Sequence, residues 1–165
     1  MSDTTLLIRP VTEVDDDRLW MMLEPVFRAG DTYAIDPAIS RADALAWWRG
    51  GTHRAFMLED GGQALGSYYI CPNQQGGGAH VCNCGFVTAP DAQGRGVARG
   101  MLQHALDEAR RRGFRAMQFN FVVETNTRAV ALWQANGFDI VGRLPGAFRH
   151  PDQGFVDALV MYRRL

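Results

Sequence analysis

Lysine is absent from this chain, and all 17 basic residues are arginines. Without a side-chain primary amine, enzymes that form a Schiff base on lysine are excluded. The net charge is only −1, which argues against binding to duplex nucleic acid, because such proteins carry clustered positive charge. No apolar run approaches the length of a membrane span. We therefore expect neither a nucleic-acid partner nor a membrane partner.

Cysteine is scarce as well: Cys71, Cys82 and Cys84 form no Cys-x-x-Cys motif. This usage favours reduced thiols in a cytoplasmic protein. The first residues, Met-Ser-Asp-Thr-Thr, lack the basic and apolar regions of a signal peptide, which supports the same localisation. His80 alternates with Cys82 and Cys84, but three ligands on one flat strand rarely converge on a metal ion. We expect small buried thiols and no metal site.

Regular elements alternate along the 165 residues, of which 47% are hydrophobic. Helical periodicity and an N-cap at Ser40 predict helices, and β-rich runs bounded by turn residues predict strands. The expected strands are 5–9, 54–58, 64–71, 80–89, 116–124, 138–143 and 155–163, and the expected helices are 13–27, 41–49, 97–112 and 127–136. This order predicts one α/β (α+β) domain over residues 1–165, with a mixed central sheet of about six to seven strands flanked by about four helices.

The most informative segment is the turn Gln93-Gly94-Arg95-Gly96-Val97-Ala98, which leads from a strand directly into a helix. The first turn of a helix has backbone N–H groups without internal partners and carries partial positive charge. Glycines at 94 and 96 remove the Cβ atoms that would keep a bulky anion away. The turn is therefore predicted to bind phosphate through its main chain. It matches neither a P-loop nor a Gly-x-Gly-x-x-Gly motif.

This turn resembles the first signature of the GNAT superfamily of acyl-CoA-dependent N-acetyltransferases, Gln/Arg-x-x-Gly-x-Gly/Ala, through Gln93, Gly96 and Ala98. The segment Asn126-Thr-Arg-Ala129-x-x-Leu132-Trp133-x-x-x-Gly137-Phe138 resembles the second. The resemblance spans nearly the whole chain and implies a GNAT-like domain that uses acetyl-CoA as cosubstrate. Homodimers are common in the family, so the resemblance also admits a homodimer.

The resemblance implies a set of cofactor contacts. In the family, the strand before the phosphate turn splays from its neighbour, and its free main-chain N–H groups meet the thioester carbonyl. The backbone of Phe86 and Thr88 is accordingly a catalytic candidate. The implied cofactor-binding residues are Phe86, Val87, Thr88, Gln93, Gly94, Arg95, Gly96, Val97, Ala98, Asn126 and Trp133.

A finer resemblance concerns the acceptor. The segments His80-Val-Cys-Asn83-Cys-Gly85-Phe86 and Phe119-Asn120-Phe-Val-Val-Glu-Thr-Asn126, with Tyr69, Pro72 and Asn73, resemble the azetidine-2-carboxylate N-acetyltransferases. Those enzymes acetylate toxic proline analogues. The resemblance implies that Asn83 holds the substrate carboxylate, that Asn126 is catalytic, and that Asn120 lies near the pocket. Tyr33, in the polar loop 30–37, is a further acceptor-contact candidate.

Each of these residues also has a structural interpretation. Asn126 stands where a helix N-cap belongs. Asn83 and Asn120 lie on predicted central strands, where buried amides need hydrogen-bond partners from the protein or from a substrate. The loop around Tyr33 could be an ordinary surface loop. The acidic run 15–17 lies in a first helical turn, where pairing with the helix dipole explains it better than ligand binding.

The sequence departs from the family at two positions. Trp133 stands where many members have a tyrosine general acid, and Asn83 stands where many have a glutamate base. Water, Glu124 or a main-chain group could then serve as the base. Because coenzyme A thiolate is a good leaving group, direct attack in a ternary complex is still expected. Alternative functions are acetylation of protein N-termini or aminoglycosides, or a non-catalytic acyl-CoA sensor.

Overall fold

The computed structural model describes residues 6–165. Seven strands form one sheet in the order β1-β2-β3-β4-β5-β7-β6, in which β4 and β5 are parallel and the other neighbours antiparallel. The strands are β1 (Leu6–Pro10), β2 (Arg54–Asp60), β3 (Gln63–Pro72), β4 (Val81–Thr88), β5 (Ala116–Val123), β6 (Asp139–His150) and β7 (Gly154–Arg164). The α-helices are α1 (Asp16–Ala29), α2 (Arg41–Arg49), α3 (Val97–Arg111) and α4 (Thr127–Ala135), and three short 3-10 turns span Glu13–Asp15, Gly76–Gly78 and Pro90–Ala92. The predicted mixed α/β architecture is confirmed.

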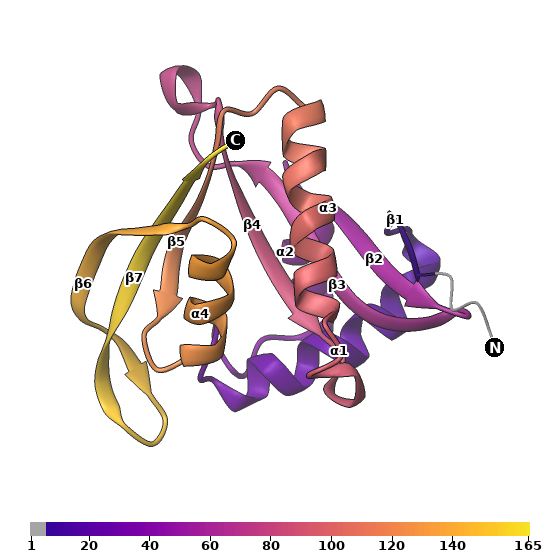
Figure 1. Cartoon of the computed structure of the whole chain (residues 1–165). Helices are drawn as coiled ribbons and strands as arrows, with labels where there is room; N and C mark the ends of the chain where they lie inside the picture. The colour runs from indigo at the N-terminus through magenta and orange to yellow at the C-terminus, as the bar shows by residue number, and fades with distance from the viewer. Residues whose placement is uncertain (1–5) are drawn as a thin grey trace.

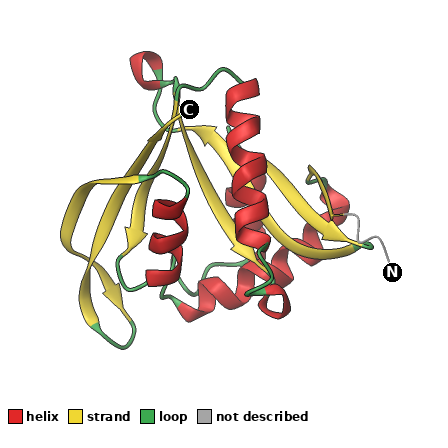
Figure 2. Cartoon of the chain, viewed as in Figure 1, coloured by secondary structure: helices red, strands yellow, loops and turns green. Residues whose placement is uncertain are grey.

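Helices cover both faces of the sheet, with α3 and α4 in front and α1 and α2 behind in the views shown (Figures 1 and 2). Strand β3 shows why, because successive residues point to opposite faces. The Tyr68 hydroxyl lies 2.7 Å from Nδ1 of His104 on α3. The hydroxyl of Ser67 accepts a hydrogen bond of 3.0 Å from the indole of Trp48 on α2. The sheet is therefore the middle of three layers.

Helix α3 supplies much of the packing against the front face. Its predicted apolar stripe is buried, and Met101, Leu102 and Ala105 have no exposed surface. The helix ends at Arg111, and Gly113 follows with φ of +82°, a left-handed conformation that only glycine adopts without strain. Apolar spacing and a glycine stop thus fix both the orientation and the length of this helix.

The hairpin of β6 and β7 is longer than predicted. The sequence indicated a strand ending at residue 143, yet β6 continues past Pro145 and Gly146 to His150. The register shifts between Leu144 and Phe148, so the interruption becomes an irregularity within one long strand. Proline is tolerated there because β6 is the last strand of the sheet. Of the predicted first strand, Thr5 lies outside the described residues, and β1 extends to Pro10.

The acidic run before and within α1 forms ion pairs instead of relying on the helix dipole alone. Asp16 receives two hydrogen bonds of 2.9 Å from Arg49 of α2. Asp17 pairs with Arg41 of α2. Asp15 is part of the 3-10 turn Glu13–Asp15 and not of the first α-helical turn. These contacts tie α1 to α2, so the run has a structural role that sequence reasoning did not identify.

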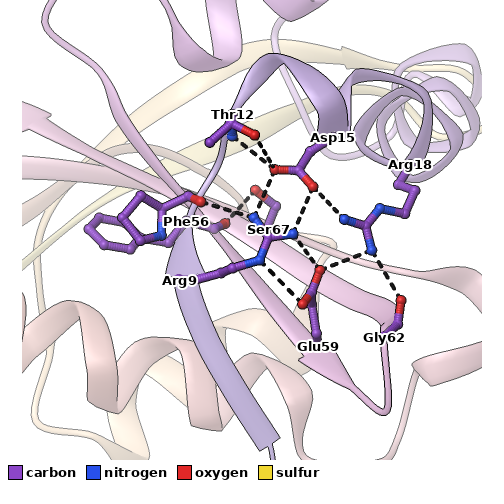
Figure 3. Close-up of polar contacts among 9 residues, drawn as sticks. Arg9, Thr12, Asp15, Arg18, Phe56, Glu59, Gly62 and Ser67 are labelled. Atoms are coloured by element: carbon purple, nitrogen blue, oxygen red, sulfur yellow. Dashed lines mark hydrogen bonds and ion pairs between the residues drawn. The ribbon is translucent and has the colours of Figure 1, made fainter.

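Asp15 occupies the centre of a four-residue charge network (Figure 3). Its side chain is fully buried and accepts from Arg9 at 2.9 Å and 2.8 Å. Arg18 also binds Asp15, and both arginines bind Glu59, at 2.6 Å from Arg9 and 2.9 Å from Arg18. The Thr12 N–H donates to Asp15 at 2.8 Å. The Arg9 guanidinium holds the pKa of Asp15 well below its usual range, and the contacts from Thr12 and Arg18 act in the same direction.

Replacing Asp15→Asn should destabilise the fold by about 1.5–3 kcal/mol, because the buried Asp15 position loses charge-assisted hydrogen bonds from Arg9 and Arg18, whose side chains are 29% and 36% exposed. Since the folded-state pKa of Asp15 is depressed, its contribution is present above the ordinary pKa of 3.8 and is lost as the pH falls below it. Urea unfolding between pH 7 and pH 3 measures both effects. The difference in the free energy of unfolding between wild type and Asp15→Asn should be smaller at pH 3 than at pH 7.

Asp17→Asn is the matched control, because its side chain is 83% exposed and surface ion pairs contribute only about 0–1 kcal/mol. Equal losses in the two variants at neutral pH would contradict the assignment of the buried network as a stabilising centre.

Candidate active site

The two parallel central strands, β4 and β5, separate from each other inside the sheet. In the part of the chain that the structure describes, β4 pairs with β5 only at Val81–Ala116 and Cys82–Met117. Beyond these pairs β4 stays with β3 as far as Thr88, and the gap between β4 and β5 widens (Figure 1). Strand β5 pairs with β7, with a register shift between Phe119 and Val122. This fork between two parallel strands is the framework of the candidate site.

The register of β4 shows which backbone groups point into the fork. The Asn73 N–H donates to the Val81 carbonyl at 2.8 Å, and the Ala89 N–H donates to the Leu65 carbonyl at 2.8 Å. Odd-numbered residues of β4 therefore direct their N–H and C=O groups to β3, and even-numbered residues direct them toward β5. After Cys82 that neighbour has moved away. The N–H groups of Phe86 and Thr88 consequently face the fork.

Val87 is the one predicted main-chain contact on β4 that points elsewhere. It pairs with Ser67 of β3, and its side chain is buried in the core with 3% exposure. The two-residue period of a strand therefore leaves the main chain of Phe86 and Thr88, but not that of Val87, facing the fork. Cofactor contact by Phe86 and Thr88 stays a prediction.

Asn83 lies directly after the last residue of β4 that pairs with β5. Its side-chain amide donates to the Gln118 carbonyl at 2.9 Å. In a continued parallel ladder, that carbonyl would accept from the N–H of Cys84. The Asn83 side chain therefore replaces a main-chain rung at the point where the strands separate. It is half-buried and lines the cavity described below, with its carbonyl oxygen and second amide hydrogen still available.

Asn120 was expected to be a buried amide on a central strand, and this expectation is wrong. It is exposed, its amide donates to Asn73 Oδ1 at 2.6 Å, and its carbonyl oxygen accepts from Gln118 at 2.9 Å. It lies beside the register shift of β5, which lifts this part of the strand out of regular pairing. Asn120 lines the rim of the cavity, and both ends of its amide already bind the protein.

A cavity of about 770 Å³ lies at the fork, lined by residues from both faces of the sheet. It brings together nearly all predicted site residues: Tyr33, Asn83, Phe86, Thr88, Gln93, Gly94, Gly96, Val97, Ala98, Asn120, Asn126 and Trp133. Val87 and Arg95 do not line it, and Arg95 instead lies 3.9 Å from Asp60. Among residues 6–165, the only charged side chains that line the cavity belong to Arg99 and Arg128.

The N-terminus of α3 forms one end of the cavity. Its N-cap is Gly96, with φ of +77°, and Gly94 has φ of +76°. Within the described chain, no side chain caps this helix and no acidic residue occupies its first turn, whereas Ser40 caps α2 by accepting from the Asp43 N–H at 3.1 Å. The first intrahelical bond is from Gly100 to Gly96, at 3.0 Å. The N–H groups of residues 97–99 thus have no intrahelical partner and are placed to bind an anion, whereas the Arg95 N–H already donates to the Ala92 carbonyl at 3.4 Å.

Aromatic rings flank the fork on the same face as α3 and α4. Trp133, with 8% exposure, packs on Phe86 at 5.1 Å and on Phe119 at 4.8 Å between ring centroids. Trp133 therefore offers an apolar surface at this position. Asn126 caps α4 by accepting from the Ala129 N–H at 3.3 Å, so its structural interpretation is confirmed, and it also lines the cavity.

The opposite face presents a second aromatic wall. The Tyr33 hydroxyl donates to the Phe86 carbonyl, so the loop after α1 reaches the strand at the fork. Burial raises the pKa of Tyr33 above its usual range, so the hydroxyl stays protonated. The interpretation of this loop as an ordinary surface segment does not hold for Tyr33. Trp47 and Tyr69 continue the wall, with ring centroids 5.4 Å apart.

Sequence reasoning gave no role to Trp47 or Tyr69. One signal was available for Tyr69: a glycine inside a strand often marks the close approach of another group. Gly85 pairs with Tyr69, and a Cβ on Gly85 would lie 2.4 Å from the tyrosine ring. No comparable signal in the sequence marks Trp47.

Within residues 6–165, no helix has the length and apolar character needed to cross a membrane. The same residues hold no group of three or more histidine, cysteine or acidic side chains placed to bind a metal ion.

Comparison with known proteins yields a family match and a curated relative. Residues 19–138 match the model of the Acetyltransferase (GNAT) family. N-acetyltransferase aca1 of Schizosaccharomyces pombe is 36% identical over 97 residues, which cover 58% of this chain. This chain spans 46% of that protein's length.

Solved structures agree with the family match. A GCN5-related N-acetyltransferase from Kribbella flavida is 43% identical, with a TM-score of 0.92 over 97% of this chain and 98% of that one. The acetyltransferase yncA of Salmonella typhimurium, solved with its cofactor acetyl-CoA, is 20% identical and shares the fold, with a TM-score of 0.83 over 97% and 94% of the two chains. The open helix terminus, the strand fork and these matches together show that the chain belongs to the GNAT family of acetyltransferases.

Proposed function

We propose that this protein transfers the acetyl group of acetyl-CoA to the amine of a small carboxylate-bearing acceptor, such as azetidine-2-carboxylate or a related proline analogue. The observation that carries the proposal is the fork between β4 and β5. Its cavity joins an uncapped helix N-terminus on one face to an aromatic and amide-lined wall on the other. A cofactor and an acceptor can therefore meet from opposite faces of the sheet.

The cofactor side follows from the main-chain geometry. The first-turn N–H groups of α3, with Gly94 and Gly96, provide a site for a pyrophosphate. The Phe86 and Thr88 N–H groups on the neighbouring strand β4 would hold the thioester end of the same cofactor. Fixed N–H donors stabilise the negative charge that develops on a thioester oxygen during attack. A protein of the same fold was solved with its cofactor acetyl-CoA, which supports acetyl-CoA as the ligand of this site.

The acceptor side favours an anionic group. Among the described residues that line the cavity, none is acidic, so a polycationic aminoglycoside would find no opposite charge there. Asn83 offers an amide N–H and a carbonyl oxygen to a small polar ligand. The aromatic wall of Tyr33, Trp47 and Tyr69 suits a compact ring.

Direct attack follows from the same chemistry. The neutral amine forms a bond to the thioester carbon, the carbon–sulfur bond breaks, and coenzyme A leaves as a thiolate. Cys84 lines the cavity, but burial raises the pKa of its thiol well above the usual value, so it is a poor acyl carrier. Trp133 has no acidic proton to give the thiolate. Solvent in the open cavity takes up the proton that the amine releases.

Position 133 is a tryptophan and not a tyrosine general acid, and this favours a second candidate function. That function is an acyl-CoA-binding sensor without turnover. Release of free coenzyme A on addition of an amine distinguishes the two. The enzyme releases thiol in proportion to the acceptor, whereas a sensor binds acetyl-CoA and releases none above background.

Replacing Gly96→Val should abolish acetyl-CoA binding, because the side chain would occupy the path to the N–H groups of α3. Valine also introduces backbone strain at φ of +77°. Gly113→Val is a matched control, because Gly113 has φ of +82° at the other end of the same helix, away from the cavity. Calorimetric titration with acetyl-CoA should show binding in the control and none in Gly96→Val. Unchanged affinity in Gly96→Val would refute the phosphate turn.

Replacing Asn83→Ala should lower kcat/KM for amino-acid acceptors roughly 10- to 150-fold, or about 1.5–3 kcal/mol, because a hydrogen bond to a charged group is lost. The affinity for acetyl-CoA should change little. Asn136→Ala is the control, since Asn136 does not line the cavity and its side chain binds the Leu132 carbonyl and the Gln103 side chain. Steady-state thiol release measures both variants. If the acceptor specificity constant of Asn83→Ala equals that of wild type, Asn83 does not hold the acceptor.

A further inference from the structure

Two of the hydrogen-bond donors on the acceptor side of the fork already bind carbonyl groups of the protein. The Tyr33 hydroxyl binds the Phe86 carbonyl, and one amide hydrogen of Asn83 binds the Gln118 carbonyl. Tyr69 also lines the cavity. Among residues 6–165 its hydroxyl binds no protein group, and because the one buried side-chain atom without a partner there is His53 Nδ1, the Tyr69 hydroxyl is accessible from the cavity. A hydroxyl in such a position can take a ligand as its partner. Tyr69 is thus the donor on this wall that awaits one.

The position of the Tyr69 hydroxyl is fixed by its surroundings. Its ring stacks on His53 with centroids 4.1 Å apart and planes 4° apart. Trp48 and Trp47 meet the ring edge to face at 5.0 Å and 5.4 Å. On the fourth side the ring lies against Gly85, where a Cβ would be 2.8 Å from the hydroxyl oxygen. The ring therefore cannot swing away, and its hydroxyl stays next to the main chain of β4.

The Tyr69 hydroxyl also lies at the reacting end of the fork. Gly85 precedes Phe86, whose N–H group faces the fork, and Asn83 lies two residues earlier on the same face of β4 as Gly85. Burial raises the pKa of Tyr69 above its usual range. The hydroxyl is therefore a neutral donor and not a phenolate base.

We propose that Tyr69 is a further acceptor-binding residue, whose hydroxyl donates a hydrogen bond to the carboxylate of the acceptor. This inference rests on the proposed function and names a second contact beside Asn83. A carboxylate accepts a strong, charge-assisted hydrogen bond from an O–H donor that has no other partner. The described residues that line the cavity include no acidic side chain that would compete for this donor. The ring of a small cyclic amino acid then packs beside Trp47.

The test compares Tyr69→Phe with Tyr68→Phe. The two tyrosines are neighbours on β3, and each variant loses one hydroxyl. Tyr68 points to the opposite face and binds His104, outside the cavity lining. With azetidine-2-carboxylate as the probe, Tyr69→Phe should lower kcat/KM about 10- to 150-fold, mainly through KM, because a charge-assisted hydrogen bond is lost. Tyr68→Phe should stay near wild type, and acetyl-CoA affinity should be unchanged in both.

A neutral analogue, azetidine-2-carboxamide, tests the charge of the partner. The loss in Tyr69→Phe should shrink to roughly 2- to 10-fold with this probe, since a neutral hydrogen bond contributes less. Equal losses with both probes would overturn the carboxylate assignment. A Tyr69→Phe enzyme that matches wild type would overturn the inference and leave the proposed function standing. A wild-type protein that releases no thiol with any small amino acid would instead refute the proposed function itself.

Discussion

The separation of β4 from β5 after two paired residues is the constraint on which the rest of this site depends. A parallel pair in the middle of a sheet normally satisfies its backbone groups by continuous pairing. Here the ladder stops at Cys82 and Met117, and the Asn83 side chain satisfies the first carbonyl beyond it. The N–H groups that follow on β4 are left facing a cavity. In the proposed function, these unpartnered groups are the ones that hold the thioester.

The surrounding structure keeps the fork open. Strand β4 pairs with β3 along its whole length, and β5 pairs with β7 on both sides of its register shift, so each arm is held on its outer side. On one face, the rings of Phe86, Phe119 and Trp133 fill the space beside the fork. On the other, Tyr33 binds the Phe86 carbonyl. The buried charge network around Asp15 and the ion pairs between α1 and α2 support the layer that carries this second wall.

Much of this arrangement was predictable from the sequence because it depends on local signals. Glycines at 94 and 96 and the apolar stripe of α3 are read directly from the chain, and they gave the phosphate turn and the helix that follows it. Ser40 gave the start of α2 correctly. Asn126 was predicted as a cap and is one. Each of these features is decided by residues within about one helical turn of each other.

What the sequence could not supply depends on pairing between distant segments. Val87 was grouped with its neighbours because a motif does not show which residues of a strand face an absent partner. Asn120 was expected to be buried, but the register shift in β5 exposes it. The confinement of Tyr69 by Gly85, His53 and Trp48 joins three separate parts of the chain. Such contacts are set by tertiary packing and leave no local pattern.

Amide hydrogen exchange along β4, measured by NMR with and without acetyl-CoA, tests the central claim most directly. The backbone N–H groups of Phe86 and Thr88, which face the fork, should exchange rapidly. Those of Gly85 and Val87, which pair with β3, should be protected with and without acetyl-CoA. Addition of acetyl-CoA should slow exchange at Phe86 and Thr88 and leave their odd-numbered neighbours unchanged. Binding of acetyl-CoA without any change at Phe86 or Thr88 would contradict the account.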